Sequence, residues 1–406
     1  MSRRKIRLSA SAIGELKACP YRYYAKYILG IRKAEDSDAQ RVGTNYHEIQ
    51  DVASRSGVCV PCANLAAPDP ECPMCAGEGF LPEDTMVAVM RVLNKAYGTL
   101  SPNLDQEKAN IERTILLYSL TGYNWHYDED EVEILARELE FEHRLVSSSG
   151  RALPDVTVQG KIDKLVRHRG KLAIMEHKST SKSVDSDSSF WAHLNLDVQT
   201  TLYIDAIQKM QTDGELASYG VRHDDPLIST ILYDAWHKPG IKPKMLTQVE
   251  SKKFVADGLY CGQKFDVGKG WMTNEVGNTR KLIGDCPAEF TPGKKEGTFA
   301  VRETPDMFGA RLLKDVVDRT DFYFARKELS KTEAEMERFR REVLSIYFDI
   351  RNKLKSNSFF HNERQCEATF KCDYTNQCYT GEVLDPENPP EGFKSIFENK
   401  DKERKK

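Results

Sequence analysis

The segment from Val158 to Ser179, VQGKIDKLVRHRGKLAIMEHKS, constrains the fold of this chain more than any other part of the sequence. Residues Val158 to Val166 and Lys171 to Lys178 are rich in apolar and β-branched side chains, and His168-Arg169-Gly170 separates them. Two such runs around a short polar break are typical of two strands joined by a tight turn. We therefore expect a β-hairpin around which the rest of the chain is organised.

Three charged side chains lie within this predicted hairpin. Because side chains alternate along a strand, Glu176 and Lys178 point to the same face of the sheet. If the turn is centred on the His168–Arg169 bond, Asp163 pairs with Ile174 and lies diagonal to Glu176 on that face. Removing unpaired charges from water costs several kcal/mol or more, so a half-buried hairpin needs something that satisfies these three groups.

A divalent metal ion would satisfy these charges. Two carboxylates and a backbone carbonyl suit the preference of Mg²⁺ or Mn²⁺ for oxygen ligands, and they leave positions open for water and a phosphate oxygen. Lys178 beside such an ion could orient or deprotonate the water that attacks a phosphodiester. The alternative is a solvated hairpin in which Glu176 and Lys178 form a simple ion pair.

Length and composition set the class of protein. With 406 residues, 40% hydrophobic residues and a net charge of -3, the chain can form one large domain with insertions or two domains of an ordinary soluble protein. No apolar run is long enough for a membrane helix, and the basic N-terminus is not followed by the apolar segment of a signal peptide. We therefore expect a cytoplasmic protein without membrane contact. The near-neutral charge neither supports nor excludes nucleic-acid binding.

Ten cysteines are many for a cytoplasmic protein, and eight of them occur in a pattern. Because disulfides are rare in a reducing compartment, metal binding is the leading interpretation. Cys59, Cys62, Cys72 and Cys75 have the spacing C-x2-C-x9-C-x2-C, which places four thiolates for tetrahedral zinc. Their segment has few large apolar residues, so we expect zinc to supply its folding energy. The local pattern resembles the zinc repeats of DnaJ-type chaperones, but it does not imply a chaperone function.

Helices and strands are predicted around the hairpin. Residues 9–32 are expected to be helical after a serine cap, with an interruption at Cys19-Pro20, and RVGTNYHEIQD is expected to form a helix that carries His47. A lone helical histidine is more often a bystander than a metal ligand. Glu138 to Leu145 alternates like a strand, and Ser229 to His237 predicts another.

Two further helices follow the hairpin in the sequence. FWAHLNLDVQTTLYIDAIQKM is amphipathic, with Gln199 and Tyr203 one turn apart on the same face. A later helix is predicted to begin with a capping box formed by Ser330 and Glu333. Its apolar face is expected to contain Met336, Phe339, Val343, Tyr347, Ile350 and Leu354.

The sequence predicts seven regions. They are N-terminal helices (1–56), a zinc-knuckle insertion (57–80), a helical region (81–137), a core containing the hairpin (138–237), an insertion or loop-rich lobe (238–304), a helical extension with the C-terminal cysteines (305–380), and a disordered tail (381–406).

The order of the motifs resembles the RecB-like branch of the PD-(D/E)XK nuclease superfamily. The motifs are His47 after G-T-x-Y, Asp163 in G-K-I-D, Glu176-His177-Lys178, and Gln199-x3-Tyr203. The resemblance implies an α/β fold with a mixed central sheet flanked by helices, plus the zinc-knuckle insertion and helical extensions. It also implies that Mg²⁺ or Mn²⁺ is held by His47, Asp163, Glu176 and His177, and that Asp163, Glu176, Lys178, Gln199 and Tyr203 form the catalytic motif near DNA.

The remaining patterned cysteines resemble an iron-sulfur clasp. Cys19 in A-C-P-Y-R, together with Cys366, Cys372 and Cys378, is similar to the cysteines that hold a [4Fe-4S] cluster in AddB-type nucleases and related CRISPR-adaptation exonucleases. Four thiolates suit such a cluster, which would tie both ends of the chain together. Here both intervals between the last three cysteines contain five residues, whereas the family pattern has two and then five. A second zinc site is the alternative.

The resemblance implies a metal-dependent DNA exonuclease of repair, recombination or phage DNA processing, acting on single strands or duplex ends. A recombination or replication protein is a possible partner. One rival hypothesis is a DNA-binding module that has kept the fold and lost catalysis. Another is a regulator that responds to the redox state of the cluster.

Overall fold

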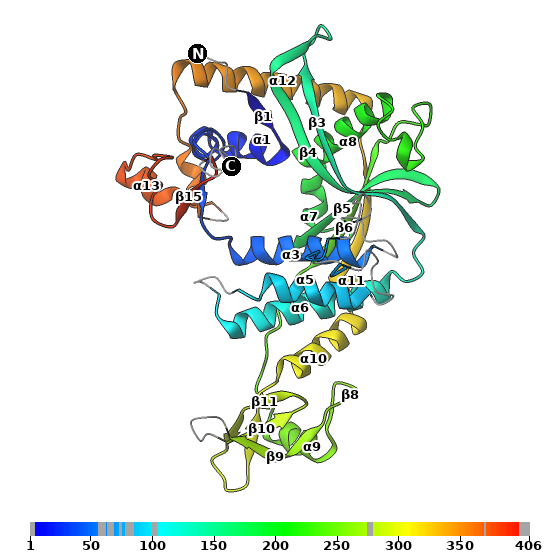
Figure 1. Cartoon of the computed structure of the whole chain (residues 1–406), viewed down its shortest axis with the longest axis vertical. Coiled ribbons are helices and arrows are strands. Elements are labelled where there is room, and N and C mark those ends of the chain that lie inside the picture. Colours follow the sequence, from blue (N-terminus) through cyan, green and yellow to red (C-terminus); the bar gives the residue numbers. More distant parts are fainter. Residues whose placement is uncertain are drawn as a thin grey trace.

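The computed structural model of the chain (Figure 1) describes residues 5–55, 62, 69–72, 75–77, 85–99, 104–273, 279–368 and 371–397. Helices cover both faces of a mixed central sheet, which confirms the predicted α/β fold class. Within these residues, no helix combines the length and the apolar character that crossing a membrane requires.

The central sheet has six strands in the order β1-β4-β5-β6-β14, with β3 paired to the opposite edge of β4. Their bounds are β1 Ile6–Leu8, β3 Val132–Val146, β4 Ala152–His168, β5 Lys171–Thr180, β6 Thr230–His237 and β14 Phe324–Ser330. The pairs β1-β4 and β5-β6 are parallel, and the other pairs are antiparallel. The predicted core of residues 138–237 is therefore too narrow, because β1 and β14 come from outside it and β3 begins earlier.

The central hairpin is formed by β4 and β5, but its register differs from the prediction. Leu165, not Asp163, pairs with Ile174, because the turn consists of Arg169 and Gly170. Both turn residues have positive φ, 50° and 78°, which matches the right-handed twist of the flanking strands. Glycine adopts this conformation at no steric cost, so Gly170 at the second position makes the two-residue turn possible.

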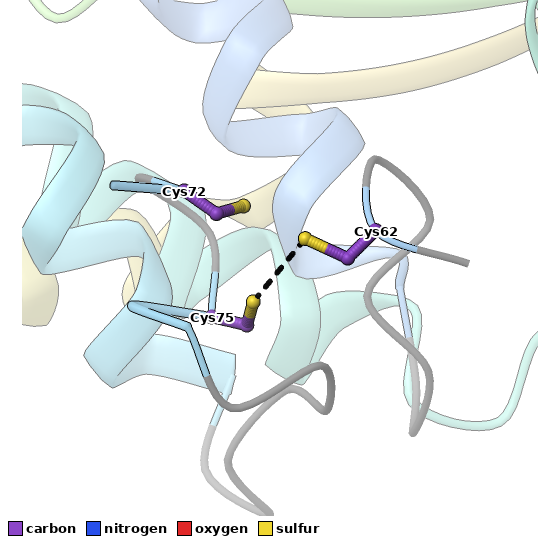
Figure 2. Close-up of side chains that lie close together, drawn as sticks. All are labelled: Cys62, Cys72 and Cys75. Atoms are coloured by element: carbon purple, nitrogen blue, oxygen red, sulfur yellow. Dashed lines mark hydrogen bonds between the residues drawn. The ribbon is translucent and has the colours of Figure 1, made fainter. Parts of the chain in front are cut away.

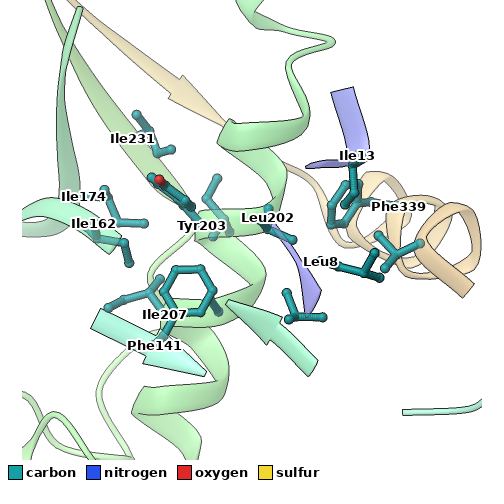
Figure 3. Packing of buried hydrophobic residues seen from close by; sticks show 14 of the residues in the cluster. Leu8, Ile13, Phe141, Ile162, Ile174, Leu202, Tyr203, Ile207, Ile231 and Phe339 are labelled. Atoms are coloured by element: carbon teal, nitrogen blue, oxygen red, sulfur yellow. The ribbon is translucent and has the colours of Figure 1, made fainter. Parts of the chain in front are cut away.

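One face of the sheet is covered by α1 (Ala10–Ala18), α7 (Ser189–Leu194), α8 (Val198–Thr212) and α12 (Glu333–Ser356). Their apolar side chains form the largest core cluster with the sheet (Figure 3). Ile162 and Ile174 of the hairpin pack there with Leu202 and Ile207 of α8. The predicted apolar face of α12 is confirmed: all six residues lie in or against this core.

The start of α12 corrects one prediction. The capping box is formed by Thr332 and Glu335, since the Thr332 hydroxyl accepts a hydrogen bond from the Glu335 amide and the Glu335 carboxylate accepts one from the Thr332 amide. Ser330 instead ends β14, where its hydroxyl lies 2.9 Å from that of Thr230 on β6. The sequence SKTE is therefore shared between a strand and a helix cap.

The other face is covered by α3 (Asp38–Ala53), α5 (Thr85–Ala96), α6 (Gln106–His126) and α10 (Pro305–Asp318). Figure 1 shows α3, α5 and α6 side by side, with α10 beyond them. A Cβ atom at Gly122 of α6 would lie only 2.3 Å from Val316 of α10, so the glycine permits this close packing. The short helix α11 (Thr320–Tyr323) then leads into β14.

Residues 238–304 form a separate lobe at one end of the molecule (Figure 1). Its described residues, which exclude 274–278, contain α9 (Gln248–Asp257) and seven short strands: β7 Leu259–Tyr260, β8 Gln263–Lys264, β9 Val267–Thr273, β10 Thr279–Ile283, β11 Cys286–Ala288, β12 Phe290–Pro292 and β13 Phe299–Val301. The lobe has its own apolar core, which includes Leu246, Phe254 and Val301. It therefore has more regular structure than the predicted loop-rich lobe.

The two ends of the described chain meet. The N-terminal segment continues from α1 through α2 (Pro20–Tyr23) and a π-helical turn (Tyr24–Ile28) into β2 (Ile31–Lys33). Near the C-terminus, α13 (Thr375–Thr380) is followed by β15 (Phe393–Ser395), which pairs with β2 in an antiparallel arrangement. The prediction of a disordered tail over 381–406 is therefore wrong for residues 381–397, and residues 398–406 lie outside the described part.

Candidate active site

The candidate site lies where β5 and β4 separate. Strand β5 pairs with β4 residues 164–168, whereas β1 pairs with residues 156–158 of the same β4 edge. Residues 159–163 of β4 therefore have no strand pairing on that edge, and Asp163 is the last residue before pairing with β5 begins. The gap leaves room for the side chains of Asp163, Glu176 and Lys178.

Asp163 is held by groups from two elements. Its Oδ2 atom lies 3.2 Å from Nδ1 of His47 on α3, and it accepts a hydrogen bond of 2.9 Å from the backbone amide of His177. His47 thus reaches the hairpin from a helix that is more than a hundred positions away in the sequence. The structure brings together His47 and Asp163 as the motif order predicts.

Glu176, Lys178 and Gln199 form a closed triangle of hydrogen bonds. The Lys178 ammonium donates to Glu176 Oε1 at 2.9 Å and to Gln199 Oε1 at 2.6 Å, and Gln199 Nε2 donates to Glu176 Oε1 at 2.5 Å. Gln199 is placed by the first turn of α8, where Asp197 caps the helix. All these bonds to Glu176 use one oxygen. The other oxygen, Oε2, is buried without a hydrogen-bond partner in the described structure.

The electrostatics of the two acids differ. Burial raises the pKa of Glu176 above its ordinary value, although the charge of Lys178 opposes this shift. Burial acts in the same direction on Asp163, but the hydrogen bond and charge of His47 outweigh it and hold the Asp163 pKa below its ordinary value. Glu176, with a side chain only 2% exposed, is therefore the group whose ionised form would gain most from an added positive charge.

The backbone and the side chain of His177 contact different groups. Its backbone amide faces Asp163, whereas its imidazole is buried on the face that α3 and α6 cover, with Nδ1 3.1 Å from Asp234 Oδ2. Since Glu176 and Lys178 point to the other face, the side chain of His177 is not part of their hydrogen-bonded triangle. Its main chain is the part that the candidate site can use.

Asp234 belongs to a buried polar network that sequence reasoning missed. The Tyr123 hydroxyl donates to Asp234 Oδ2, and Arg326 Nε lies 3.5 Å from Oδ1. Arg326 also pairs with Asp130 and stacks over the Tyr127 ring with its guanidinium carbon 3.6 Å from the centroid. The sequence did contain a signal, namely an acid in the middle of the otherwise apolar strand STILYDAWH.

Tyr203 lies beside the site in the core. It is buried between the ring of Phe141, at 5.8 Å between centroids, and the backbone of Gly160. A Cβ atom at Gly160 would lie 2.6 Å from Phe141 and 3.2 Å from Tyr203, so the glycine creates the space for both rings. Burial raises the pKa of Tyr203, whereas a hydrogen bond with Gln199 acts against this shift, so the ring packs in the core and the hydroxyl contacts the hydrogen-bonded triangle.

The two groups of cysteines are each brought together. Cys62, Cys72 and Cys75 are buried, with one ligand atom from each within 4.8 Å of the others (Figure 2). Cys59, the fourth predicted member, lies outside the described residues. Around α13, a shallow cavity is lined by the other four patterned cysteines, Cys19, Cys366, Cys372 and Cys378.

Burial raises the pKa of Cys378 to about 11, and the neighbouring thiols of Cys372, Cys366 and Cys19 add to this shift. The four cysteines therefore lie near one another around this cavity. Their arrangement is wider than that of the first group: among the described residues, three such ligand atoms lie within 4.8 Å of one another only at Cys62, Cys72 and Cys75.

Comparison with known proteins identifies the family. The model of the PD-(D/E)XK nuclease superfamily matches residues 7–379. The chain belongs to the PD-(D/E)XK nuclease superfamily. The match extends from β1 to α13, so it includes the whole central sheet and the candidate site. No curated protein matches the chain. Membership in this superfamily implies a nuclease, that is, a phosphodiester hydrolase.

Proposed function

We propose that this member of the superfamily is an Mg²⁺- or Mn²⁺-dependent deoxyribonuclease of the RecB-like branch, acting as an exonuclease on single strands or duplex ends. The observation that carries the proposal is the convergence of Asp163, Glu176 and Lys178 at the point where β4 and β5 separate, with His47 beside Asp163. Repair, recombination and phage DNA processing are the settings in which such an activity is used.

The chemistry of the residues present suits a divalent ion. The ligand atoms of His47, Asp163 and Glu176 do not all lie within 4.8 Å of one another, so metal binding would draw these side chains together. Glu176 Oε2 is a buried carboxylate oxygen without a hydrogen-bond partner in the described structure, and leaving such an atom unsatisfied is costly. Asp163, Glu176, the His177 carbonyl and His47 would supply oxygen ligands and one imidazole nitrogen, a donor set that suits Mn²⁺ as well as Mg²⁺. When bound, the metal ion would polarise the phosphate and lower the pKa of a water molecule.

The chain itself contributes orientation and a proton carrier. Gln199 and Lys178 both bind Glu176 Oε1, so they fix the carboxylate in one orientation and leave Oε2 for other ligands. The charge of Glu176 raises the pKa of Lys178, in spite of burial, and keeps its ammonium protonated. Lys178 Nζ can therefore stabilise negative charge on a phosphate and hold a proton next to the attacked group.

For the four-cysteine group we propose a [4Fe-4S] cluster. A single zinc ion with bonds of about 2.3 Å would bring its sulfurs within about 3.8 Å of one another. Cys19, Cys366, Cys372 and Cys378 face a common cavity, but they are not among the described ligand sets within 4.8 Å. The wider spacing supports a multi-iron group rather than one ion. Such a cluster would join the N-terminal helices to the C-terminal segment, as in the AddB-type clasp.

The decisive experiment is a cleavage assay on linear, circular and single-stranded DNA with Mg²⁺, Mn²⁺ or a chelator. We expect metal-dependent products from the wild type and none from Asp163→Ala, Glu176→Gln or Lys178→Ala, with DNA binding largely retained. Glu142→Gln is a matched control, because this glutamate lies exposed on β3 of the same sheet. Full activity of Glu176→Ala with Mn²⁺ would overturn the assignment.

Two further outcomes separate the rivals. Binding of DNA without metal-dependent products would favour a module that has lost catalysis. Activity that follows the oxidation state of the cluster would favour a redox-regulated protein, whereas activity unchanged by oxidation would leave the cluster with a structural role. About four iron and four sulfide per chain in protein purified without oxygen would support the proposed cluster.

A further inference from the structure

We propose that Cys62, Cys72 and Cys75 form a structural zinc site that fixes the helix pair α3 and α5 and, through α3, the position of His47. The zinc site stands on its own geometry, and only its effect on His47 rests on the proposed function. Cys59 lies outside the described residues, so the proposal is built on the other three cysteines.

The sulfur geometry fits one tetrahedral ion. The Sγ atoms of Cys62 and Cys75 lie 3.7 Å apart, and one ligand atom from each of the three cysteines falls within 4.8 Å of the others. Four sulfurs at about 2.3 Å from a zinc ion would be separated by about 3.8 Å, close to the observed spacing. Figure 2 shows the three side chains pointing toward one another, with Cys62 opposite the neighbouring pair Cys72 and Cys75.

The described backbone next to Cys72 and Cys75 turns tightly. The Cys72 amide donates to the Asp69 carbonyl at 3.0 Å, and the Ala76 amide donates to the Cys72 carbonyl at 2.8 Å. Ala76 and Gly77 both have positive φ, 51° and 86°. A non-glycine residue seldom adopts this conformation, so the turn after Cys75 is held against a local preference. A metal bond to Cys75 would provide the force that keeps the turn in place.

A single zinc ion would use all three buried cysteines at once. Their exposed fractions are 6%, 4% and 0%, and a disulfide would involve only two of them. Buried thiols usually behave as small apolar groups, but they then have no reason to converge on one point from different segments. Thiolate ligands in a compact tetrahedral group favour zinc over magnesium, manganese or calcium, which prefer oxygen.

The site belongs to the core that holds α3. The three cysteines pack in one apolar cluster with Tyr46 and Ile49 of α3 and with Val89 of α5. The Tyr46 ring stacks on Trp236 of β6 at 4.2 Å between centroids, with 19° between the planes. Tyr46 directly precedes His47, whose ring contacts Asp163. Zinc would therefore stabilise the packing that sets the position of His47 relative to the hairpin.

Metal analysis tests the site in the whole protein, independently of nuclease activity. Protein expressed without added zinc and purified without oxygen is expected to contain one zinc per chain, and Asp163→Ala should contain the same amount. The double variant Cys62→Ser/Cys75→Ser should lose this zinc, whereas Cys286→Ser, a change in a partly exposed cysteine of the lobe, should retain it. Absence of zinc from the wild type, or full zinc in the double variant, would overturn the site.

A second measurement does not depend on the folding of a variant. Titration of the wild-type protein with an organomercurial should release one equivalent of zinc, detected with a chromogenic chelator, as the buried thiols react. Cys372→Ser should lose iron and keep this zinc. Zinc that disappears in Cys372→Ser but persists in Cys62→Ser/Cys75→Ser would place the ion in the C-terminal group and refute the proposal.

Hydrogen exchange tests the link to α3. Amides of Asp38–Ala53 are expected to exchange faster in Cys62→Ser/Cys75→Ser than in the wild type, while amides of α12 on the opposite face of the sheet serve as the internal control. Zinc loss without faster exchange in α3 would overturn the bracing role. Because neither readout uses DNA, failure of the proposed nuclease function would not be mistaken for failure of the zinc site.

Discussion

Replacement of Asp234 offers a direct test of the buried network behind the candidate site. Asp234 is 1% exposed and contacts three groups, namely the Tyr123 hydroxyl, Arg326 and the imidazole of His177. Changing it to alanine leaves the largely buried guanidinium of Arg326 with one fewer negative partner and leaves the Tyr123 hydroxyl without its buried acceptor. Removing one member of a buried ion pair usually costs about 3–5 kcal/mol.

The expected cost lies at the lower end of this range. Arg326 keeps its ion pair with Asp130 and its stacking on Tyr127 in the variant, so the charge is not left without partners. We therefore expect Asp234→Ala to lower the free energy of unfolding by about 3 kcal/mol. Asp234→Asn keeps the shape and one acceptor oxygen, so the loss should be smaller, about 2 kcal/mol, because only the charge is removed.

Urea unfolding followed by tryptophan fluorescence measures both changes, since Trp236 is fully buried two residues after Asp234. The control is Asp349→Ala on the surface of α12, where an i,i+4 pair with Lys353 should contribute less than about 0.5 kcal/mol. A change below about 1 kcal/mol for Asp234→Ala would refute the argument, because the network would then not need the buried carboxylate.

Three other substitutions test separate contacts. Gln199→Ala removes the amide that orients Glu176. Loss of a residue that orients a metal ligand commonly lowers metal affinity by about 10–100-fold, so a Mn²⁺ titration of nuclease activity should show a decrease of that size. An unchanged Mn²⁺ dependence would contradict the orienting role. Tyr203→Phe keeps the ring between Phe141 and Gly160 but removes the hydroxyl that bonds to Gln199. Loss of one neutral hydrogen bond, about 0.5–1.5 kcal/mol, should lower activity in the cleavage assay by about two- to tenfold; unchanged activity would mean that the hydroxyl does not position Gln199. Phe339→Ala empties a position in the core between α12 and the sheet and should lower the free energy of unfolding by about 3–5 kcal/mol, measured by urea unfolding; a loss under about 1 kcal/mol would mean that α12 is not held by this core.

The hairpin shows why a site can be predicted from a register that is wrong. The prediction centred the turn on His168–Arg169, whereas the turn residues are Arg169 and Gly170. Each residue of β4 therefore pairs with a β5 residue two positions later than predicted. A shift of two residues preserves the face to which each side chain points, whereas a shift of one would reverse it. Asp163, Glu176 and Lys178 thus meet on one face in either register. The glycine at the second turn position was the local signal for the correct one.

Other parts of the site depend on contacts between distant segments, which local patterns do not reveal. Neither His47 on α3 nor Gln199 on α8 has a neighbour in sequence that indicates its partner, so only the family resemblance linked them to the hairpin. Asp234 lies on β6, whose parallel pairing with β5 sets it directly beside His177. Parallel neighbours come from separate segments, and periodicity within one strand cannot assign such a partner. The short strand β15 escaped prediction for the same reason, because only its pairing with β2 makes it a strand.

The chain is held by packing near both cysteine groups, on either side of His47. Tyr374, next to Cys372 in the C-terminal group, donates a hydrogen bond of 2.6 Å to the Ile31 carbonyl of β2, and α3 begins five residues after β2 ends. At the other end, Cys62, Cys72 and Cys75 belong to the same apolar cluster as Ile49 in the second half of α3. His47 lies between these attachments. A carboxylate fixed by a hairpin and an imidazole fixed by a helix can share one metal ion only if helix and sheet keep their separation, because ligand distances vary by only a few tenths of an ångström. Contacts that hold the chain on both sides of His47 would keep the distance between α3 and the sheet constant, without adding any group to the site itself.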